Sequence, residues 1–144
     1  MEKKIWFDMD GTIADLYGVE GWLEMLRAED ATPYRTARPL VNLQALARVL
    51  NRLARNGYEI NIISWTAKYG KPAYNEATAA AKREWLAKHL ASVNFTNIDI
   101  VAYGTPKQNG RDGILFDDEE PNRNAWNGIA YDVDNIIEIL RGLK

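Results

Sequence analysis

Residues 5–12 read Ile-Trp-Phe-Asp-Met-Asp-Gly-Thr, which places Asp8 and Asp10 two positions apart directly after a short apolar run. Two like charges this close repel each other, so one carboxylate takes up a proton or a cation holds both. A strand that leads such a pair into a glycine turn is typical of a metal site or an acid–base site. Solvated aspartate turns and calcium-binding loops share this short pattern, so its meaning depends on the rest of the chain.

Two further apolar runs end in polar groups in the same way. Residues 60–63 lead into Ser64-Trp65-Thr66, and residues 114–116 lead into Asp117-Asp118-Glu119-Glu120. Continuous apolar runs separated by helical stretches predict an α/β fold with a mainly parallel sheet whose strands are buried on both faces. Ligands bind at the carboxyl ends of the strands in such sheets, so we expect the three polar ends to meet in one crevice.

The expected crevice contains Asp8, Asp10, Ser64, Asp117 and Asp118. Four carboxylates in one crevice need a cation. Because the chain has no cysteine and one histidine, the ligands would be oxygen atoms, which favour Mg²⁺ over zinc.

These residues together resemble the motifs of the haloacid dehalogenase (HAD) superfamily of phosphohydrolases. The resemblance spans nearly the whole chain and depends on residues 8–12, Ser64, a lysine ahead of the acidic strand, and Asp117-Asp118. It implies a Rossmann-like three-layer sandwich with a mainly parallel sheet and a small helical cap after the first strand. The expected domain organisation is a single HAD-like domain over residues 1–144, with a cap or flap at about 16–38.

Within the superfamily, the chain is most similar to the small 5'(3')-deoxyribonucleotidases. The similarity lies in residues 82–86 (Lys-Arg-Glu-Trp-Leu) on a predicted helix, in Lys107 ten positions before Asp117, and in the run 113–118. It implies a Mg²⁺-dependent phosphomonoesterase whose substrate is a small organic phosphate, with nucleoside or deoxynucleoside monophosphates as the first choice.

The chemistry of the residues and the resemblance agree on the roles of the first motif. Asp8 is the expected nucleophile, which forms an aspartyl-phosphate, and Asp10 is the expected general acid and base. The resemblance also implies a Mg²⁺ site of Asp8, Asp10 through its backbone carbonyl, and Asp118. Asp117 is either a further ligand or an outer partner.

Ser64, Trp65 and Lys107 are the residues expected to bind the substrate phosphate. The Ser64 hydroxyl offers a donor at a strand end, Trp65 is expected to face the crevice, and Lys107 supplies a positive charge. Lys82 is a rival for the cationic role. We prefer Lys107 because its distance from Asp117 matches the family, whereas Lys82 lies on a helix with a plausible solvent face.

The cap determines the expected substrate range. Val19, Trp22 and Leu26 recur at helical spacing, so we interpret Trp22 as a packing residue in preference to one that stacks on a base. A flap as short as residues 16–38 is not expected to build a deep specificity pocket by itself. Alternative substrates are therefore a sugar phosphate or a phosphoprotein. A non-catalytic binding protein is a third hypothesis, and intact Asp8 and Asp10 count against it.

Charge and hydropathy limit the classes of binding partner that we expect. The net charge of −2 provides no basic footprint for stable nucleic-acid binding. No apolar stretch is long enough for a signal peptide or a membrane span, so we expect no membrane partner and a cytoplasmic protein. No oligomeric state is predicted.

The expected strands cover residues 5–7, 58–64, 98–103, 113–117 and 129–131. The expected helices cover 19–29, the segment between Asn42 and Gly57, 75–90 and 133–143. A short turn or helix is expected at 122–127 and a polar loop at 30–39.

Overall fold

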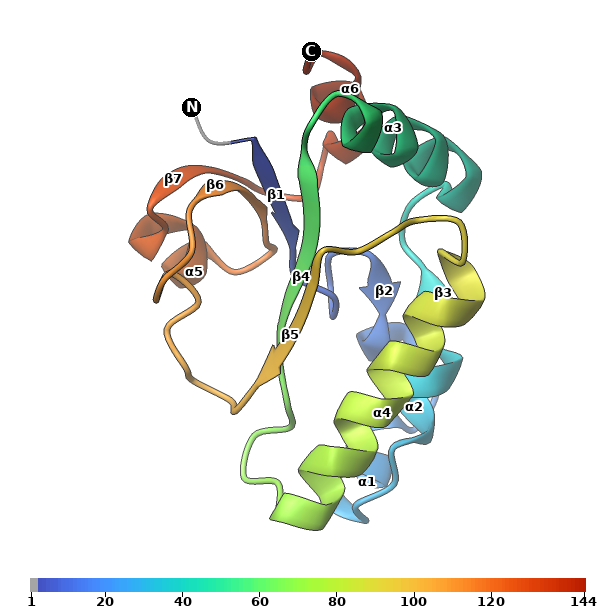
Figure 1. Cartoon of the computed structure of the whole chain (residues 1–144). Helices are drawn as coiled ribbons and strands as arrows, with labels where there is room; N and C mark the ends of the chain where they lie inside the picture. The colour runs from blue at the N-terminus through green and yellow to red at the C-terminus, as the bar shows by residue number, and fades with distance from the viewer. Residues whose placement is uncertain (1–2) are drawn as a thin grey trace.

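The computed structural model describes residues 3–144, and within them five parallel strands form the central sheet in the order β5-β4-β1-β6-β7 (Figure 1). The strands are β1 (Lys4–Phe7), β4 (Glu59–Trp65), β5 (Asn97–Val101), β6 (Gly113–Phe116) and β7 (Gly128–Tyr131). The predicted α/β fold with a mainly parallel sheet is confirmed. Its continuous apolar runs are buried because helices or loops cover both faces of the sheet.

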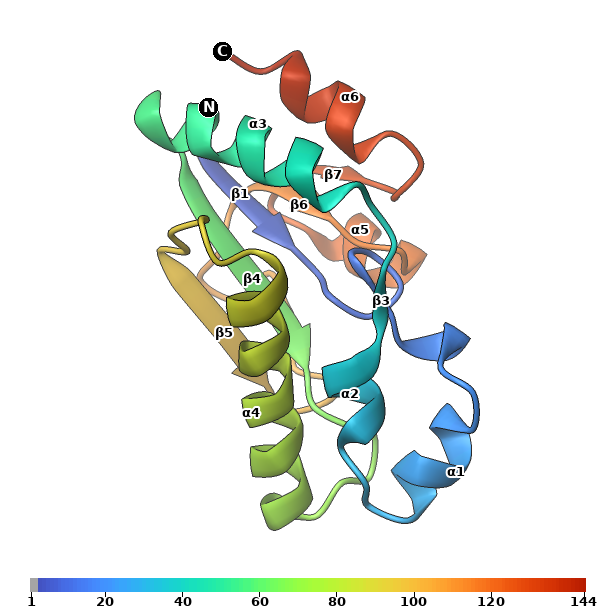
Figure 2. The same ribbon diagram turned by 90° about the vertical axis from the view of Figure 1, so that its right-hand side faces the viewer.

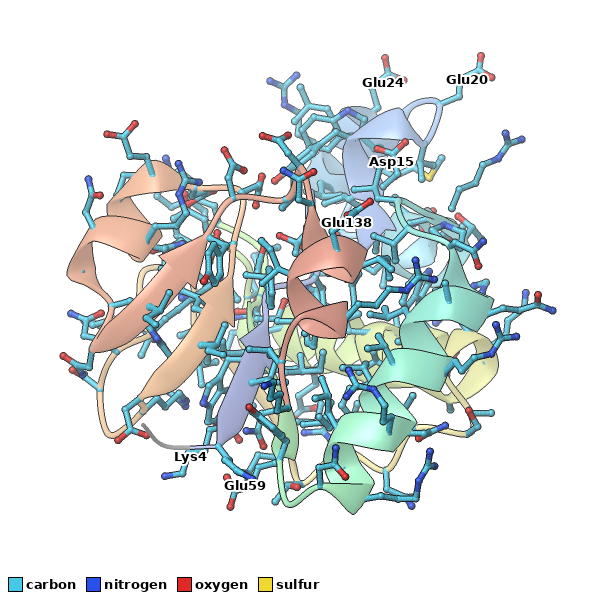
Figure 3. All side chains as sticks on the ribbon, turned by 90° about the horizontal axis from the view of Figure 1, so that it is seen from above. Lys4, Asp15, Glu20, Glu24, Glu59 and Glu138 are labelled. Atoms are coloured by element: carbon cyan, nitrogen blue, oxygen red, sulfur yellow. The ribbon has the colours of Figure 1, made fainter. Side chains whose placement is uncertain are left out.

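One face of the sheet carries most of the core. Side chains from β1, β4 and β6 pack there against α3 (Leu43–Arg55), α4 (Pro72–His89) and α6 (Ile136–Arg141), and Figure 3 shows α3 and α6 side by side. The opposite layer is thin, because the short helix α5 (Glu120–Ala125) and the irregular segment 102–112 supply it. Trp126, just after α5, packs there against Trp6, Ile63 and Leu115.

The strand order places the first aspartates at the centre of the molecule. From β1 the sheet grows through β4 to β5 on one side and through β6 to β7 on the other. The crevice at such a reversal of strand order, outside the carboxyl ends of the strands, is the usual ligand site of an open α/β sheet. The start of β1 and the end of α6 lie at the opposite end of the molecule in Figure 1.

The segment 16–38, here called the insert, contains three short helices. They are η1 (Leu16–Gly18), α1 (Trp22–Arg27) and α2 (Thr32–Thr36), and the two-stranded sheet of β2 (Ala14–Asp15) and β3 (Arg38–Pro39) closes the base of the insert. Figures 1 and 2 show α1 and α2 beyond the carboxyl ends of the main strands, with α2 beside α4. The acidic side chains of Glu20 and Glu24 point away from the body (Figure 3).

The predicted element boundaries are close to those observed, and the main differences concern α4, α1, the loop 30–39 and α6, which covers Ile136–Arg141 in place of the predicted 133–143. Helix α3 begins where it was expected, because the Asn42 side chain accepts a hydrogen bond from the Ala45 amide. Helix α4 begins at Pro72 rather than at residue 75, since proline suits the first turn of a helix. Helix α1 is shorter than the predicted 19–29, and the predicted loop 30–39 contains α2, which also has a proline in its first turn. No helix among residues 3–144 is both long and apolar enough to span a bilayer.

Candidate active site

A tight turn after β1 holds the two aspartates of the first motif. The Met9 carbonyl accepts hydrogen bonds from the amides of Thr12, Ile13 and Ala14, at 3.1, 3.0 and 3.0 Å. Gly11 lies in this turn at φ +81°, and a Cβ atom there would overlap the carboxylate of Asp118. Glycine is therefore required both by the backbone and by the close approach of the loop after β6.

Three carboxylates converge where these two loops meet. Asp8, Asp117 and Asp118 offer oxygen atoms that all lie within 4.8 Å of one another. The Thr12 hydroxyl donates to Asp8 Oδ2 at 3.0 Å and lies 3.4 Å from Asp118 Oδ1. Burial and the Asp8 carboxylate raise the pKa of Asp118 to about 8 and that of Asp117 to about 6. Such a crowded set of hard oxygen donors fits a cation such as Mg²⁺.

Lys107 lies between two of these carboxylates. Its Nζ is 2.9 Å from Asp8 Oδ1 and 2.8 Å from Asp117 Oδ2, and the side chain is 3% exposed. Burial opposes the charge of Lys107, but Asp8 and Asp117 together raise its pKa above the ordinary value. Asp117 also accepts from the Glu119 amide at 2.9 Å and from Asn122 at 3.2 Å. Both oxygens of Asp117 are thus held by protein donors.

Two anchors fix the irregular segment that carries Lys107. Arg111 pairs with Asp99 at 3.0 Å, donates to the Lys107 carbonyl at 3.3 Å and lies over the ring of Trp6. The Trp65 indole donates to the Thr105 carbonyl at 2.8 Å. The segment is therefore held in place although it contains no helix.

Lys82 also belongs to the site, and the expectation that it lies on a solvent face was wrong. The side chain is 1% exposed, and its Nζ lies 2.8 Å from Asp10 Oδ2, 2.6 Å from Ser64 Oγ and 2.7 Å from the Trp65 carbonyl. It is buried because α4 packs against α2 of the insert on this side, where Tyr34 places its ring 5.2 Å from Nζ. Burial raises the pKa of Asp10 above its ordinary value, and the Lys82 ammonium opposes that rise.

The end of β4 contributes a hydroxyl, an indole and a second hydroxyl. Ser64 is buried, and its Oγ accepts the hydrogen bond from Lys82. Because an ammonium only donates, the hydroxyl hydrogen of Ser64 remains available for another acceptor. Trp65 and Thr66 line the neighbouring pocket. Thr66 Oγ1 is buried and has no hydrogen-bond partner among the residues that the structure describes, so it is a second free donor at this strand end.

A pocket of about 620 Å³ opens from Asp8, Asp10 and Lys107. The insert supplies one wall and the loops after β4 and β5 supply the other, so the pocket is larger than a short flap alone could build. Its lining is rich in rings, namely Tyr17, Trp22, Tyr34, Trp65, Tyr69, Tyr74 and Tyr103.

Trp22 lies in this lining and not in the core. Its ring packs edge-on against Tyr17 with centroids 5.1 Å apart, and no residue of α1 is buried. Trp22 is therefore not a core residue, and its packing contact is with Tyr17 of the insert. Leu26, one turn further along α1, packs against a small apolar cluster that includes Leu16 and Tyr34, and both Trp22 and Leu26 also line the pocket.

The sequence analysis missed Thr66 and the tyrosines of the pocket, and it named Lys82 as a rival cation but assigned it to a solvent face. Thr66 follows Ser64 by two positions and could have been found from the alternation of side chains at a strand end. Lys82 had no such signal, because its helix is rich in alanine and shows no clear apolar face. The tyrosines come singly from short helices, from the start of α4 and from loops, so their spacing in the sequence carries no information.

Comparisons with known proteins support the fold. No protein-family model matches the sequence, and a search of the curated proteins finds no match. Among solved structures, the fold is similar to the crystal structure of D,D-heptose 1,7-bisphosphate phosphatase from Burkholderia thailandensis. The likeness has a TM-score of 0.53 and 18% sequence identity, and it covers 86% of this chain and 71% of that chain. At this identity the likeness shows a shared fold.

Proposed function

We propose that the protein is a Mg²⁺-dependent phosphomonoesterase of the HAD type, which acts through an aspartyl-phosphate on nucleoside or deoxynucleoside monophosphates. The observation that carries the proposal is the meeting of Asp8, Asp10, Lys107 and the Asp117-Asp118 pair beside a pocket lined with aromatic rings. The similarity of the fold to a sugar bisphosphate phosphatase is consistent with phosphatase chemistry.

In the proposed reaction, Asp8 attacks phosphorus and Asp10 protonates the leaving oxygen. Lys107 balances the charge of Asp8 and of the phosphoryl oxygens, while Thr12 and Lys107 hold the Asp8 carboxylate in one orientation. Asp8, the backbone carbonyl of Asp10, and Asp118 would hold the Mg²⁺. When bound, the ion would neutralise the repulsion between a carboxylate nucleophile and an anionic phosphate. Asp117 would act from outside the metal site by holding Lys107.

Asp10 is suited to carry a proton in both directions. Its side chain is 19% exposed, and burial raises its pKa, which favours the protonated form that the leaving oxygen needs. After the alcohol leaves, the ionised Asp10 would take a proton from the water that hydrolyses the aspartyl-phosphate. Ser64 and Thr66 would donate to phosphoryl oxygens, and Trp65 would close the side of this subsite by lying over Lys107, 5.0 Å from Nζ to the ring centroid.

The aromatic lining favours a nucleotide over a sugar phosphate. A nucleobase has two flat faces that stack on aromatic side chains, whereas a sugar mainly needs hydrogen-bond partners. A sugar phosphate or a phosphoprotein remains the alternative substrate of the same chemistry.

The test is a screen of purified protein against a panel of phosphate monoesters, with Mg²⁺ and after treatment with EDTA. We expect Mg²⁺-dependent phosphate release with nucleoside monophosphates above sugar phosphates. Asp8→Asn, which removes the nucleophile and keeps the side-chain shape, should abolish turnover and exclude a contaminating phosphatase. Turnover that persists in EDTA would contradict the metal role, and a preference for sugar phosphates would contradict the nucleotide substrate. No turnover on any ester would favour a binding protein.

A further inference from the structure

Tyr69 occupies a backbone position that ordinarily belongs to glycine. Its φ is +61°, and Glu29 is the one other non-glycine residue with positive φ within residues 3–144. Tyr69 is the third residue of a tight turn that the hydrogen bond from the Gly70 amide to the Ala67 carbonyl closes at 3.1 Å. Glycine is strongly preferred at this position of such a turn, and a side chain there costs about 1 kcal/mol.

Contacts of the Tyr69 ring within the folded chain do little to offset this backbone cost. The residue is 92% exposed, so its ring buries almost no surface against the rest of the chain. It nevertheless belongs to the lining of the pocket that opens from Asp8. Backbone strain that folding does not explain is typical of positions where a side chain contacts a ligand.

A continuous wall connects Tyr69 to the proposed phosphate subsite. Lys107 Nζ lies 5.0 Å from the centre of the Trp65 ring, and the Trp65 ring lies 5.0 Å from that of Tyr103, centre to centre. The centre of the Tyr103 ring lies 5.7 Å from Lys68 Nζ. Lys68 in turn lies 5.2 Å from the centroid of the Tyr69 ring. The wall consists of three aromatic rings and two lysines, and its outer end is the rim formed by Lys68, Tyr69 and Tyr103.

From this arrangement we infer that the rim is the nucleobase subsite, with Tyr69 as the side chain that determines specificity for a flat, acceptor-rich ring. The inference rests on the proposed function. Tyr69 stacks on the face of the base, and Lys68, which has no carboxylate partner within the described chain, donates to acceptor atoms on its edge. Trp22 and Tyr17 form the facing wall of the pocket.

Three variants of Tyr69 separate its role in binding from its effect on the backbone. Tyr69→Phe keeps the ring and the strain, Tyr69→Ala removes the ring and keeps the strain, and Tyr69→Gly removes both. Steady-state kinetics are measured with nucleoside monophosphates and with acetyl phosphate, which carries no ring, and thermal unfolding is followed in parallel. The ratio of the two kcat/KM values isolates recognition of the base.

We expect Tyr69→Ala and Tyr69→Gly to raise KM for nucleotides about tenfold, the lower part of the range for one base–aromatic stack. The preference for nucleotides over acetyl phosphate should fall by a similar factor in both variants, and Tyr69→Phe should keep it. Tyr69→Gly alone should raise the melting temperature, by about 3 °C for a chain of this length. Loss of affinity together with a gain in stability is a result that a merely structural tyrosine would not give.

An unchanged nucleotide KM in Tyr69→Gly, or an equal loss on acetyl phosphate, would overturn the inference. Either result would leave the proposed phosphatase intact, because the wild-type enzyme would still hydrolyse nucleotides. A wild-type enzyme that hydrolyses no nucleotide would overturn the proposed substrate and this inference with it, before any variant is made.

Discussion

The two buried lysines divide the aspartates of the site between them. Lys107 pairs with Asp8 and Asp117, and Lys82 pairs with Asp10. Asp118 is the aspartate of this group with no lysine against it within the described chain, and burial and the Asp8 carboxylate raise its pKa to about 8, compared with about 6 for Asp117. A bound cation would act mainly on this carboxylate, so the ammonium groups and the metal would complement rather than duplicate each other.

Lys82 offers a test of this division at the scale of one residue. Lys82→Met keeps the length of the side chain but leaves Asp10, Ser64 Oγ and the Trp65 carbonyl without their shared donor. We expect a loss of about 3 kcal/mol in the free energy of unfolding, at the low end for breaking a buried ion pair, because Asp10 is partly exposed. Turnover should fall as well, since Asp10 and Ser64 lose their orientation.

Chemical denaturation measures the stability loss, and Lys88→Met on the exposed side of the same helix is the matched control. That variant should stay within about 0.5 kcal/mol of wild type. Equal stability of the two methionine variants would show that the Lys82 contacts contribute nothing to folding.

Gly11 provides a second test at the residue scale, because Gly104 shares its backbone conformation without its crowding. The φ angles are +81° and +85°, but a Cβ on Gly104 would meet no atom within 4 Å, whereas one on Gly11 would displace Asp118. Each alanine variant should lose about 1 kcal/mol of stability through its positive φ. Only Gly11→Ala should also lower the affinity for Mg²⁺, by tenfold or more, as measured by the Mg²⁺ concentration that phosphate release requires. The same Mg²⁺ dependence in both variants would argue against Asp118 as a ligand.

At the scale of elements, the sequence predicted what local patterns encode. The run 114–116 is apolar throughout and the run 60–63 is interrupted only by Asn61, a pattern that favours strands covered on both faces, so the sheet and the meeting of its polar ends could be predicted. The burial of Lys82 depends on where α2 of the insert packs, and no pattern within α4 carries that information. The aromatic lining of the pocket is likewise made of single residues from the insert, the end of β4, the loops after β4 and β5, and α4, which only the tertiary fold brings together.

The insert is the element whose role can be tested most directly. Because no residue of α1 is buried, Trp22→Ala should change the free energy of unfolding by less than about 1 kcal/mol, while KM for nucleotides rises. Trp85→Ala in the core of α4 is the comparison, with an expected loss of about 3–5 kcal/mol. Calorimetry and steady-state kinetics on the two variants give the answer. A large stability loss in Trp22→Ala would show that Trp22 acts mainly through packing and not through contact with the substrate.

At the scale of the whole molecule, the crowded carboxylates connect stability to pH and to Mg²⁺. Asp117 and Asp118 have pKa values raised from 3.8 to about 6 and about 8, so the folded protein binds their protons more tightly than the unfolded chain does. In the metal-free protein, the contribution of these two groups to the free energy of unfolding should therefore be fully present below about pH 4. It should fall as the pH rises towards 8.

Mg²⁺ would take the place of the Asp118 proton, so its stabilising effect should grow as the pH rises towards 8. At a hundredfold excess over its Kd, a ligand of the folded state contributes about 2.7 kcal/mol, so the Mg²⁺-induced rise in melting temperature should be largest near pH 8 and small near pH 5. Thermal unfolding with Mg²⁺ and with EDTA at several pH values measures it. The Asp118→Asn variant, which lacks the carboxylate whose pKa is raised to about 8, should lose most of both effects. A Mg²⁺ effect that is absent, or that is larger at pH 5 than at pH 8, would mean that these carboxylates do not form a metal site.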